Sequence, residues 1–559
     1  MSAVSIVGAL VIGKLFWLQI IHNNRYSEKA EHQYVTPSTS FDRGSIYFTD
    51  RDGHTVAAAT IESGFKAAIV PAQIQDAEAL YQTLVETIGD AVELDKEEII
   101  ASVAKKGDPY EEVAVRIPKD VAETLVAKKV PGLTLYREKW RFYPGGSLAS
   151  KAIGFVSYKD NKLVGNYGLE SFYNDVLTRT HENLSVNFFA ELFANVQSTL
   201  FKNTSTTGDV VTTIEPTVQS ELEAAVENIR SRWASDAVGA MVMDPHTGAI
   251  VAMAQVPTFD LNDFGSVDDV SIYANPLTQS VYEMGSIIKP IVMAAAIDAE
   301  VVTPQTTYTD KGSVQVNDRT IYNFDKKARG TVSMQEVLSQ SLNTGMVFVQ
   351  QKMGKEKFRE YMVDRFLFGE KTGIDLPSEV RGLVSNLKTA NDVNYATASF
   401  GQGIATSPIN IVRAFGALAN GGYLVTPHLA RAIEQENGAE RIIEYKKQGP
   451  IIKPETSVTI GEMLTKVVDS GYDRGLEHYT VAAKTGTAQI ARPGGLGYYD
   501  DRNLHSLIGF FPVRDPRFVV YFFNYYPKNN GQFAIQTLAE PFFDVIQFLA
   551  NYYEITPDR

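Results

Sequence analysis

Four serines in this sequence are followed by a lysine three positions later, and one of these pairs lies in the stretch YEMGSIIKP, residues 282–290. At this spacing a serine and a lysine can act as a nucleophile and its base, because a lysine removed from solvent gives up its proton more readily. The pair can equally be structural, with the serine as a helix cap and the lysine extended toward solvent. The four pairs are Ser63/Lys66, Ser102/Lys105, Ser286/Lys289 and Ser385/Lys388. Spacing alone therefore does not select one of them.

Pro290 places the third pair at the start of a helix. Its nitrogen carries no hydrogen, so it cannot bond to the carbonyl of Ser286 and belongs in the first turn. The following residues, IVMAAAIDAEVV, continue as a helix. Backbone N–H groups and the positive end of the helix dipole then lie beside the Ser286 hydroxyl, where they stabilise developing negative charge. Lys289 lies on the same face one turn later and can reach that hydroxyl.

Two further motifs follow in the chain. Residues 341–343 form Ser-Leu-Asn inside the helix-like stretch SMQEVLSQSLNTGMVFVQQ, and residues 484–487 form Lys-Thr-Gly-Thr in the middle of a predicted strand. Each has a second copy, SVN at 185–187 and KTG at 371–373. The first copy precedes the expected domain boundary and the second lies in a loop-like segment. The order of the three motifs, with the last on a strand, singles out Ser286.

The elements that must position these motifs follow from hydrophobic patterning. AVGAMVMD and AIVAMAQV predict two apolar strands joined by a turn, and YTVAAKTGTAQI, HSLIGFFP and RFVVYFFNYY predict three more. Pro216 opens an amphipathic helix before the first two strands, and AIQTLAEPFFDVIQFLANYYEI predicts a helix that covers the sheet. The predicted fold class is α+β, with an antiparallel sheet flanked by helices.

Composition limits the class of protein. A chain of 559 residues is too long for one core. Its net charge of −14 argues against a nucleic-acid-binding surface. It contains no cysteine, which excludes disulfides, thiolate metal sites and thiol catalysis. We find no metal-ligand cluster, nucleotide loop or cofactor signature in the sequence, so no metal and no cofactor are expected.

Three segments are expected along the chain. Residues 3–21 are mostly apolar, are interrupted by Lys14 and are about long enough to span a bilayer. We predict a membrane anchor over residues 1–22 that is incomplete at its N-terminus; a buried helix and a cleaved signal peptide are the alternatives. The polar segment 201–209 predicts a boundary between a non-catalytic domain, residues 23–205, and a catalytic domain, residues 206–559.

The three motifs, in this order, resemble those of the penicillin-binding transpeptidases and the serine β-lactamases. The flanking segments are similar to those of class B penicillin-binding proteins. They are MDPHTGAIVAMAQVPTFDLN, FLFGEKTGIDLPSE, ASFGQGIATSPINIVRAFGALANGGYLVTPHL, FDRGSIYFTDRDGHTVA, RFYPGGSLASKAIGF and YGLESFY. The resemblance runs from about Lys14 to the C-terminus. It implies a membrane anchor, a rod-like pedestal of the dimerisation type over residues 23–205, and a penicillin-binding transpeptidase domain with a serine β-lactamase-like fold.

The resemblance implies a peptidoglycan D,D-transpeptidase that works in cell-wall synthesis. Ser286 would attack the D-Ala-D-Ala carbonyl of a stem peptide, form an acyl-enzyme and release D-alanine. Lys289 would be the base, and Ser341 would relay a proton to the leaving amine. Asn343 would hold Lys289 and a substrate amide. An amine of a second stem peptide, or water in a carboxypeptidase side reaction, would then take the acyl group.

The strand motif would bind the substrate. By the same resemblance, Lys484 supplies positive charge, and the hydroxyls of Thr485 and Thr487 suit the terminal carboxylate. Gly486 would let a peptide approach the strand and add to it as an extra strand. The backbone N–H groups of Ser286 and Thr487 would form the oxyanion hole.

The sequence departs from the family pattern at several positions, and it leaves other functions open. Met284 and Ile288 replace the proline and phenylalanine that are usual beside the serine, so β-lactam affinity does not follow from the resemblance. The middle motif is SLN where many relatives have a second serine, and the spacing between RG and FTDRDG is two residues longer than is common. A β-lactam sensor, a β-lactamase-like protein and a non-catalytic scaffold of the division complex are the alternatives. We find neither a deacylating Glu-x-x-Leu-Asn element nor a glycosyltransferase signature.

Partners and location follow from the resemblance alone. The expected partners are peptidoglycan stem peptides, β-lactam antibiotics, a membrane-embedded polymerase of glycan strands and other proteins of division or elongation. A single membrane pass with the catalytic domain outside the cytoplasm is expected. A septal role is favoured over elongation. His246 and His505 are predicted to be structural.

Overall fold

The computed structural model describes residues 42–159, 162–179, 207–472, 475–492, 494, 497–529 and 531–559. The predicted anchor, residues 1–22, and the predicted boundary near residue 205 lie outside these ranges. Within them, no helix combines the length and apolar character that crossing a membrane requires. The described chain forms two compact units. One contains residues 61–142, and the other contains residues 44–60, 143–179 and the chain beyond 206.

The larger unit is built on an antiparallel sheet in the order β18-β19-β20-β8-β9. Its strands are β8 (Ala237–Met243), β9 (Ile250–Val256), β18 (Ala482–Ala491), β19 (Tyr498–Phe511) and β20 (Phe518–Tyr525). All five were predicted from sequence, and the Lys-Thr-Gly-Thr motif lies in β18 as expected. Strand β18 is at the edge of this sheet, so one side of its backbone does not face a neighbouring strand of the sheet.

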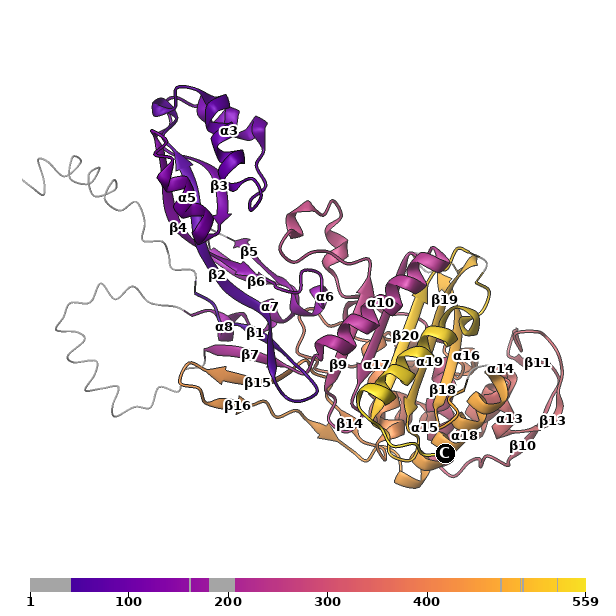
Figure 1. Ribbon diagram of the computed structural model, residues 1–559. Helices are drawn as coiled ribbons and strands as arrows, with labels where there is room; N and C mark the ends of the chain where they lie inside the picture. The colour runs from indigo at the N-terminus through magenta and orange to yellow at the C-terminus, as the bar shows by residue number, and fades with distance from the viewer. Residues whose placement is uncertain are drawn as a thin grey trace, which may run out of the picture. The chain divides into compact units, whose positions relative to one another are not determined.

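Helices cover both faces of this sheet (Figure 1). Helices α10 (Pro216–Trp233) and α19 (Ala534–Tyr552) pack on one face, and α12 (Lys289–Asp298), α17 (Pro408–Ala419) and α18 (Pro454–Gly471) are on the other. Along β20, Phe522 belongs to the core formed with α10 and α19, whereas Tyr521 and Phe523 belong to the core on the opposite face of the sheet. Because both faces are buried, β8, β9 and β20 are apolar at almost every position instead of alternating. The predicted α+β class is confirmed.

Helix α10 begins where the sequence predicted. Pro216 occupies its first position, where a missing N–H costs no hydrogen bond. The side chain of Glu215 accepts a hydrogen bond from the N–H of Val218 at 2.5 Å and caps the helix.

Two pairs of antiparallel strands and two helices form an insertion beside α12. Strand β10 (Thr307–Asp310) pairs with β13 (Gly330–Ser333), and between them in the chain β11 (Ser313–Val316) and β12 (Arg319–Tyr322) form a hairpin. Helices α13 (Met334–Ser339) and α14 (Asn343–Met353) follow. The stretch around Ser341 was predicted as helix. It is instead a break between two helices, because Ser341 has a φ of 53°, which no α-helical residue adopts.

The larger unit also contains a second set of paired strands. Strand β1 (Ile46–Thr49) pairs with the first half of β2 (Thr55–Ile69) and runs parallel to β7 (Gly208–Thr212), which pairs with β15 (Ala430–Gln435). The remaining strands are β5 (Phe155–Lys159), β6 (Lys162–Asn166), β14 (Leu424–Val425), β16 (Glu440–Ile442) and β17 (Lys447–Gln448). Short helices are α6 (Ser150–Ile153), α7 (Gly168–Phe172), α8 (Asn174–Leu177), α11 (Pro276–Gln279), α15 (Lys355–Arg359) and α16 (Asp392–Ala398).

The smaller unit has its own core. The second half of β2 pairs with β3 (Glu111–Ile117), and β4 (Leu133–Phe142) also pairs with β2. Helices α3 (Ala77–Ile88), α4 (Lys96–Ala104) and α5 (Lys119–Ala127) contribute Leu80, Leu84, Ile99 and other apolar side chains to this core.

Truncating Leu538 in α19 tests the role of that helix in covering the sheet. Its side chain has no solvent exposure, so we expect Leu538→Ala to cost about 2–5 kcal/mol and to lower the melting temperature in a calorimetric scan. Val458→Ala is the control because Val458 is 63% exposed on α18, and it should change stability by less than about 0.5 kcal/mol. Equal melting temperatures for both variants would contradict this packing.

Candidate active site

Ser286 lies in a single 3-10 turn, Gly285–Ile288, that leads directly into α12. Pro290 is in the first turn of that helix, as its chemistry requires. Gly285 has a φ of 57° and donates its N–H to the carbonyl oxygen of Gly401 at 3.1 Å. A Cβ on Gly401 would come within 2.1 Å of the Gly285 oxygen. The glycine at 401 therefore allows the turn that carries Ser286 to be held by the neighbouring loop.

Gly486 allows the same turn to approach β18. A Cβ at this position would lie 2.8 Å from the carbonyl oxygen of Met284 and 2.5 Å from the Ser506 hydroxyl. The sequence suggested that this glycine makes room for substrate. The structure shows a second reason for glycine at this position, because any side chain here would push the serine turn away from the strand.

Lys289 is fully buried and uses all three ammonium hydrogens on one segment. Nζ donates to the carbonyl oxygen of Ser341 at 2.6 Å, to Ser341 Oγ at 3.1 Å and to Asn343 Oδ1 at 2.8 Å. The amide of Asn343 also donates through Nδ2 to the carbonyl oxygen of Tyr322 at 3.0 Å. The first two motifs, more than fifty residues apart in sequence, are therefore joined at the lysine.

Burial changes the acid–base behaviour of the two motif lysines. Desolvation, and then the nearby positive charge of Lys484, hold the pKa of Lys289 well below its usual value. Desolvation lowers the pKa of Lys484 to about 8. Its Nζ donates to the Thr485 carbonyl oxygen at 3.0 Å. The oxygen atoms that accept hydrogen bonds from Lys289 and Lys484 carry no charge. Without a carboxylate beside it, Lys289 favours its uncharged form, and the positive charge of Lys484 favours an anionic ligand.

A cavity of about 870 Å³ joins the motif residues. It is lined by Ser286, Ser341, Asn343, Lys484, Thr485 and Thr487, together with residues of α18 and the start of α19. The Thr487 hydroxyl accepts a hydrogen bond from the N–H of Ala534 at 3.1 Å, which leaves its own hydrogen free to point at a ligand. The Ser286 side chain, the two side chains that hold buried Lys289, and Lys484 with its two neighbouring threonines therefore face one space. This is an arrangement for acyl transfer.

The two unusual residues of the serine turn point into the core. Met284 and Ile288 are each 1% exposed, and neither lines the cavity. The two histidines are also accounted for by structural contacts. His246 Nε2 lies 3.0 Å from the Pro516 carbonyl oxygen, and the buried His505 Nδ1 lies 2.9 Å from Thr537 Oγ1.

Two supports of the site carry no sequence motif. Asp310 is 1% exposed and accepts hydrogen bonds from Thr344 Oγ1 at 2.7 Å and from Asn323 Nδ2 at 3.0 Å, which fixes the residue next to Asn343. Glu283 accepts from the Tyr498 hydroxyl at 2.8 Å and from the N–H of Gly403 at 3.0 Å. These contacts join segments that are distant in the sequence, and no sequence motif marks them. The one available signal was that Glu283 lies next to the serine turn in the chain.

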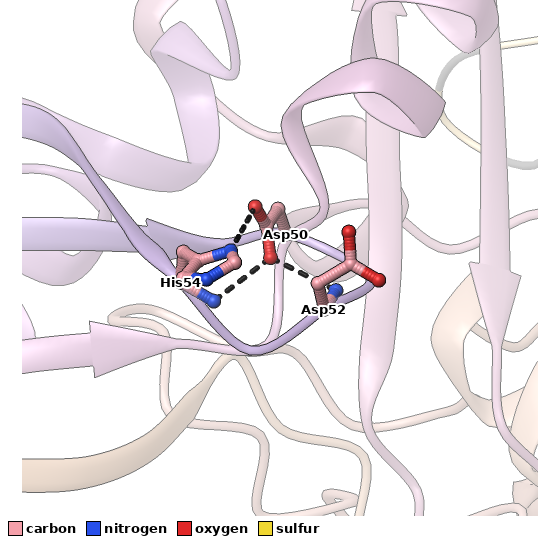
Figure 2. Close-up of side chains that lie close together, drawn as sticks. All are labelled: Asp50, Asp52 and His54. Carbon is pink, nitrogen blue, oxygen red and sulfur yellow. Dashed lines mark hydrogen bonds and ion pairs between the residues drawn. The ribbon is translucent and has the colours of Figure 1, made fainter.

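A group of side chains with metal-ligand chemistry lies away from this cavity, in the turn between β1 and β2 (Figure 2). Asp50 Oδ1 accepts from the N–H groups of Asp52 at 2.9 Å and His54 at 2.8 Å, and Asp50 Oδ2 lies 3.1 Å from His54 Nδ1. Asp52 and His54 are exposed. These hydrogen bonds account for the cluster as a carboxylate-stabilised turn.

Comparisons with known proteins match two family domains along the chain. The family described as "Penicillin binding protein transpeptidase domain" matches residues 238–546, and "Penicillin-binding Protein dimerisation domain" matches residues 38–213. Stage V sporulation protein D of Bacillus subtilis is 32% identical over 552 residues, which cover 96% of this chain and 82% of the relative. The peptidoglycan D,D-transpeptidase MrdA of Acinetobacter baumannii is 28% identical, with 96% of this chain and 85% of the relative covered.

A solved structure shares the fold over most of the chain. The crystal structure of penicillin binding protein 2X from Streptococcus thermophilus has a TM-score of 0.72 and 22% sequence identity, and the match covers 92% of this chain and 80% of that one.

The electrostatic coupling between the two lysines can be measured directly. Removing the charge of Lys484 removes a repulsion that disfavours protonated Lys289, so we expect the pKa of Lys289 to rise in Lys484→Met. The measurement is an NMR titration of ¹³Cε-labelled lysine, with the signal assigned by its loss in Lys289→Met. Lys371→Met, in an exposed loop, is the control and should leave the Lys289 titration unchanged. An unchanged or lower Lys289 pKa in Lys484→Met would refute the coupling.

Proposed function

The chain belongs to the class B penicillin-binding proteins and is a serine-type peptidoglycan D,D-transpeptidase, and we propose that Ser286 is its nucleophile. As such it cross-links peptidoglycan stem peptides and binds β-lactams. The observation that carries the assignment of Ser286 is the contact of Lys289 with the Ser341–Asn343 segment, beside the turn that holds the serine. The three other Ser-x-x-Lys pairs do not line this cavity.

Acylation uses neutral Lys289 as the base. Its amine takes the proton of Ser286 Oγ while Oγ attacks the carbonyl carbon of the penultimate D-alanine. The tetrahedral intermediate then collapses with cleavage of the C–N bond, and the terminal D-alanine leaves as an amine after receiving a proton. Ser341 Oγ, 3.1 Å from Lys289 Nζ, passes that proton to the leaving group. Asn343 keeps the lysine in place through Oδ1.

Charge stabilisation comes from the backbone and from β18. The N–H groups of Ser286 and Thr487 donate to the developing oxyanion, and the 3-10 turn adds the positive end of its dipole. The hydroxyls of Thr485 and Thr487 and the ammonium group of Lys484 bind the terminal carboxylate. The buried positive charge of Lys484 supports this role, because within the described residues its ammonium contacts a neutral carbonyl rather than an acid.

Labelling with a fluorescent penicillin tests the nucleophile. Ser286→Ala should lose covalent labelling because no other hydroxyl lies at the start of α12. Ser63→Ala, which removes the serine of another Ser-x-x-Lys pair on β2 of the smaller unit, is the matched control and should label like the wild type. Equal labelling of Ser286→Ala and wild type would refute the assignment.

A β-lactam sensor and a non-catalytic scaffold make different predictions for product formation. A sensor would acylate at Ser286 but would form no cross-linked peptide when supplied with lipid-linked precursor and a glycan polymerase. A scaffold would do neither. Mass spectrometry of the digested product, with and without Ser286→Ala, separates these outcomes from transpeptidation.

The cellular role extends this proposal. An anchor over residues 1–22 would hold the enzyme at the membrane with its catalytic domain outside the cytoplasm, next to a membrane-embedded glycan polymerase that it contacts through anchor and pedestal. The residues 38–213 that match the dimerisation family support the pedestal, residues 23–205, as the non-catalytic domain. A septal role is our first proposal. A relative named for stage V of sporulation supports a role in sporulation as a second candidate.

Depletion in the source bacterium distinguishes these roles. Loss of a septal enzyme should give filaments, because elongation continues while division stops. Rounded cells would instead indicate an elongation enzyme, and normal growth with a defect confined to spores would indicate the second candidate.

A further inference from the structure

A second cavity lies in the larger unit, away from Ser286. Its volume is about 340 Å³, and it shares no lining residue with the active-site cavity. Its walls include residues 315–317 at the end of β11, Gln350 and Gln351 in α14, and Lys355 and Asp392 at the starts of α15 and α16. Helices α14 and α16 both pack against β11. Segments that are distant in the sequence therefore form one hollow, which we call the amide pocket.

The amide pocket contains a buried polar group without a partner. Gln350 is 4% exposed, and its side-chain amide makes no hydrogen bond to a described residue. Gln315 is only partly satisfied, because Nε2 uses one hydrogen on the Asn317 carbonyl oxygen at 2.8 Å and Oε1 accepts from Thr320 Oγ1 at 2.6 Å. A buried amide costs free energy unless a ligand or water satisfies it. The pocket therefore offers both donors and acceptors to a bound molecule.

The charges of the amide pocket cancel. Lys355 Nζ lies 2.7 Å from Asp392 Oδ1 and donates to the Ala390 carbonyl oxygen at 2.8 Å. Val316, which is 5% exposed, is the only apolar side chain among the described residues of the lining. The pocket thus suits neither an ion nor an apolar ligand, but a neutral polar one. A carboxamide presents a donor and an acceptor side by side, which matches neighbouring hydroxyls and the N-acetyl group of an amino sugar.

The amide pocket lies within reach of the active site. Gln350 follows Asn343 by about two turns of α14, so the two residues share a face of the helix and lie about 10 Å apart. The β11–β12 hairpin bridges the same two places, because the Tyr322 carbonyl oxygen at one end accepts from Asn343 Nδ2 at 3.0 Å and Val316 at the other end lines the pocket. An extended peptide of about four residues covers ~13 Å. A stem peptide carried by a sugar in this pocket is therefore long enough to reach the active-site cavity.

We propose that the amide pocket binds N-acetylated sugar residues of a peptidoglycan glycan strand and so places the stem peptides of that strand near Ser286. This rests on the proposed function, because the strand is held there for the cross-linking of its peptides. Gln350 hydrogen-bonds to the sugar from the buried side of the pocket, and Asp392 accepts from a hydroxyl group at its open side. The enzyme then recognises the polymer as well as the peptide.

A binding experiment with stem-free sugars tests the pocket without requiring catalysis. The probe is a tetrasaccharide of alternating N-acetylglucosamine and N-acetylmuramic acid that carries no peptide, titrated into the full chain by ligand-observed NMR. Cellotetraose, which has no N-acetyl groups, and a free stem pentapeptide are the comparison ligands. Each titration is repeated after acylation with penicillin, which blocks the active-site cavity and should leave binding at the amide pocket unchanged.

Two variants alter the pocket in different ways. Gln350→Met keeps the size of the buried side chain but removes its amide, and we expect it to weaken tetrasaccharide binding about tenfold, equivalent to ~1.4 kcal/mol. Gln351→Trp, at an exposed position of α14, fills the pocket and should weaken binding at least as much. Gln82→Met is the matched control, because Gln82 is exposed on a helix of the smaller unit and should bind like the wild type. Both pocket variants should keep wild-type labelling by fluorescent penicillin but form less cross-linked polymer.

The outcomes separate this proposal from the function on which it rests. Tetrasaccharide binding that is equal in the wild type, Gln350→Met and Gln351→Trp would overturn the amide pocket, as would a wild type that does not bind the sugar. Loss of binding after acylation with penicillin, or equal binding of the pentapeptide to the acylated protein, would also overturn it. Sugar binding with the expected variant effects, in a protein that penicillin does not label, would support the pocket and refute the assignment of Ser286.

Discussion

The contact of buried Lys289 with Ser341 and Asn343 is the interaction on which the catalytic unit depends. A lysine without solvent exposure is costly unless its hydrogens are satisfied, and here all three go to one short segment. The acceptors are neutral, so they hold the amine in position without stabilising its charge as a carboxylate would. The cost of burial therefore appears as a lowered pKa, which is the property a base for Ser286 requires.

Much of the surrounding structure can be understood as support for that contact. Ser341 takes a left-handed conformation so that both its carbonyl and its hydroxyl face the lysine. The buried carboxylate of Asp310 fixes Thr344 and, with it, the start of α14 that carries Asn343. On the other side, Gly401 and Gly486 allow the serine turn to lie against a loop and a strand without steric conflict. Small residues and one buried acid thus set the geometry of the reacting groups.

The edge position of β18 connects this geometry to the substrate. A strand with one free side can accept an extended peptide, and in the function we propose Thr485 and Thr487 bind the end of that peptide. In that proposed function, a fixed carboxylate fixes the direction of the donor along the strand.

The sequence alone determined the fold class, the five strands of the main sheet, the helices that begin at Pro216 and Pro290, and the family, because these depend on local patterning and on the order of short motifs. It placed Ser341 inside a helix, since the triplet lies in a helix-forming stretch and nothing local signals a positive φ. Only the tertiary structure decided which acceptors hold Lys289 and how Glu283 and Asp310 support the site. The physical reason is that these contacts join segments far apart in the chain, whose pairing depends on packing rather than on any local pattern.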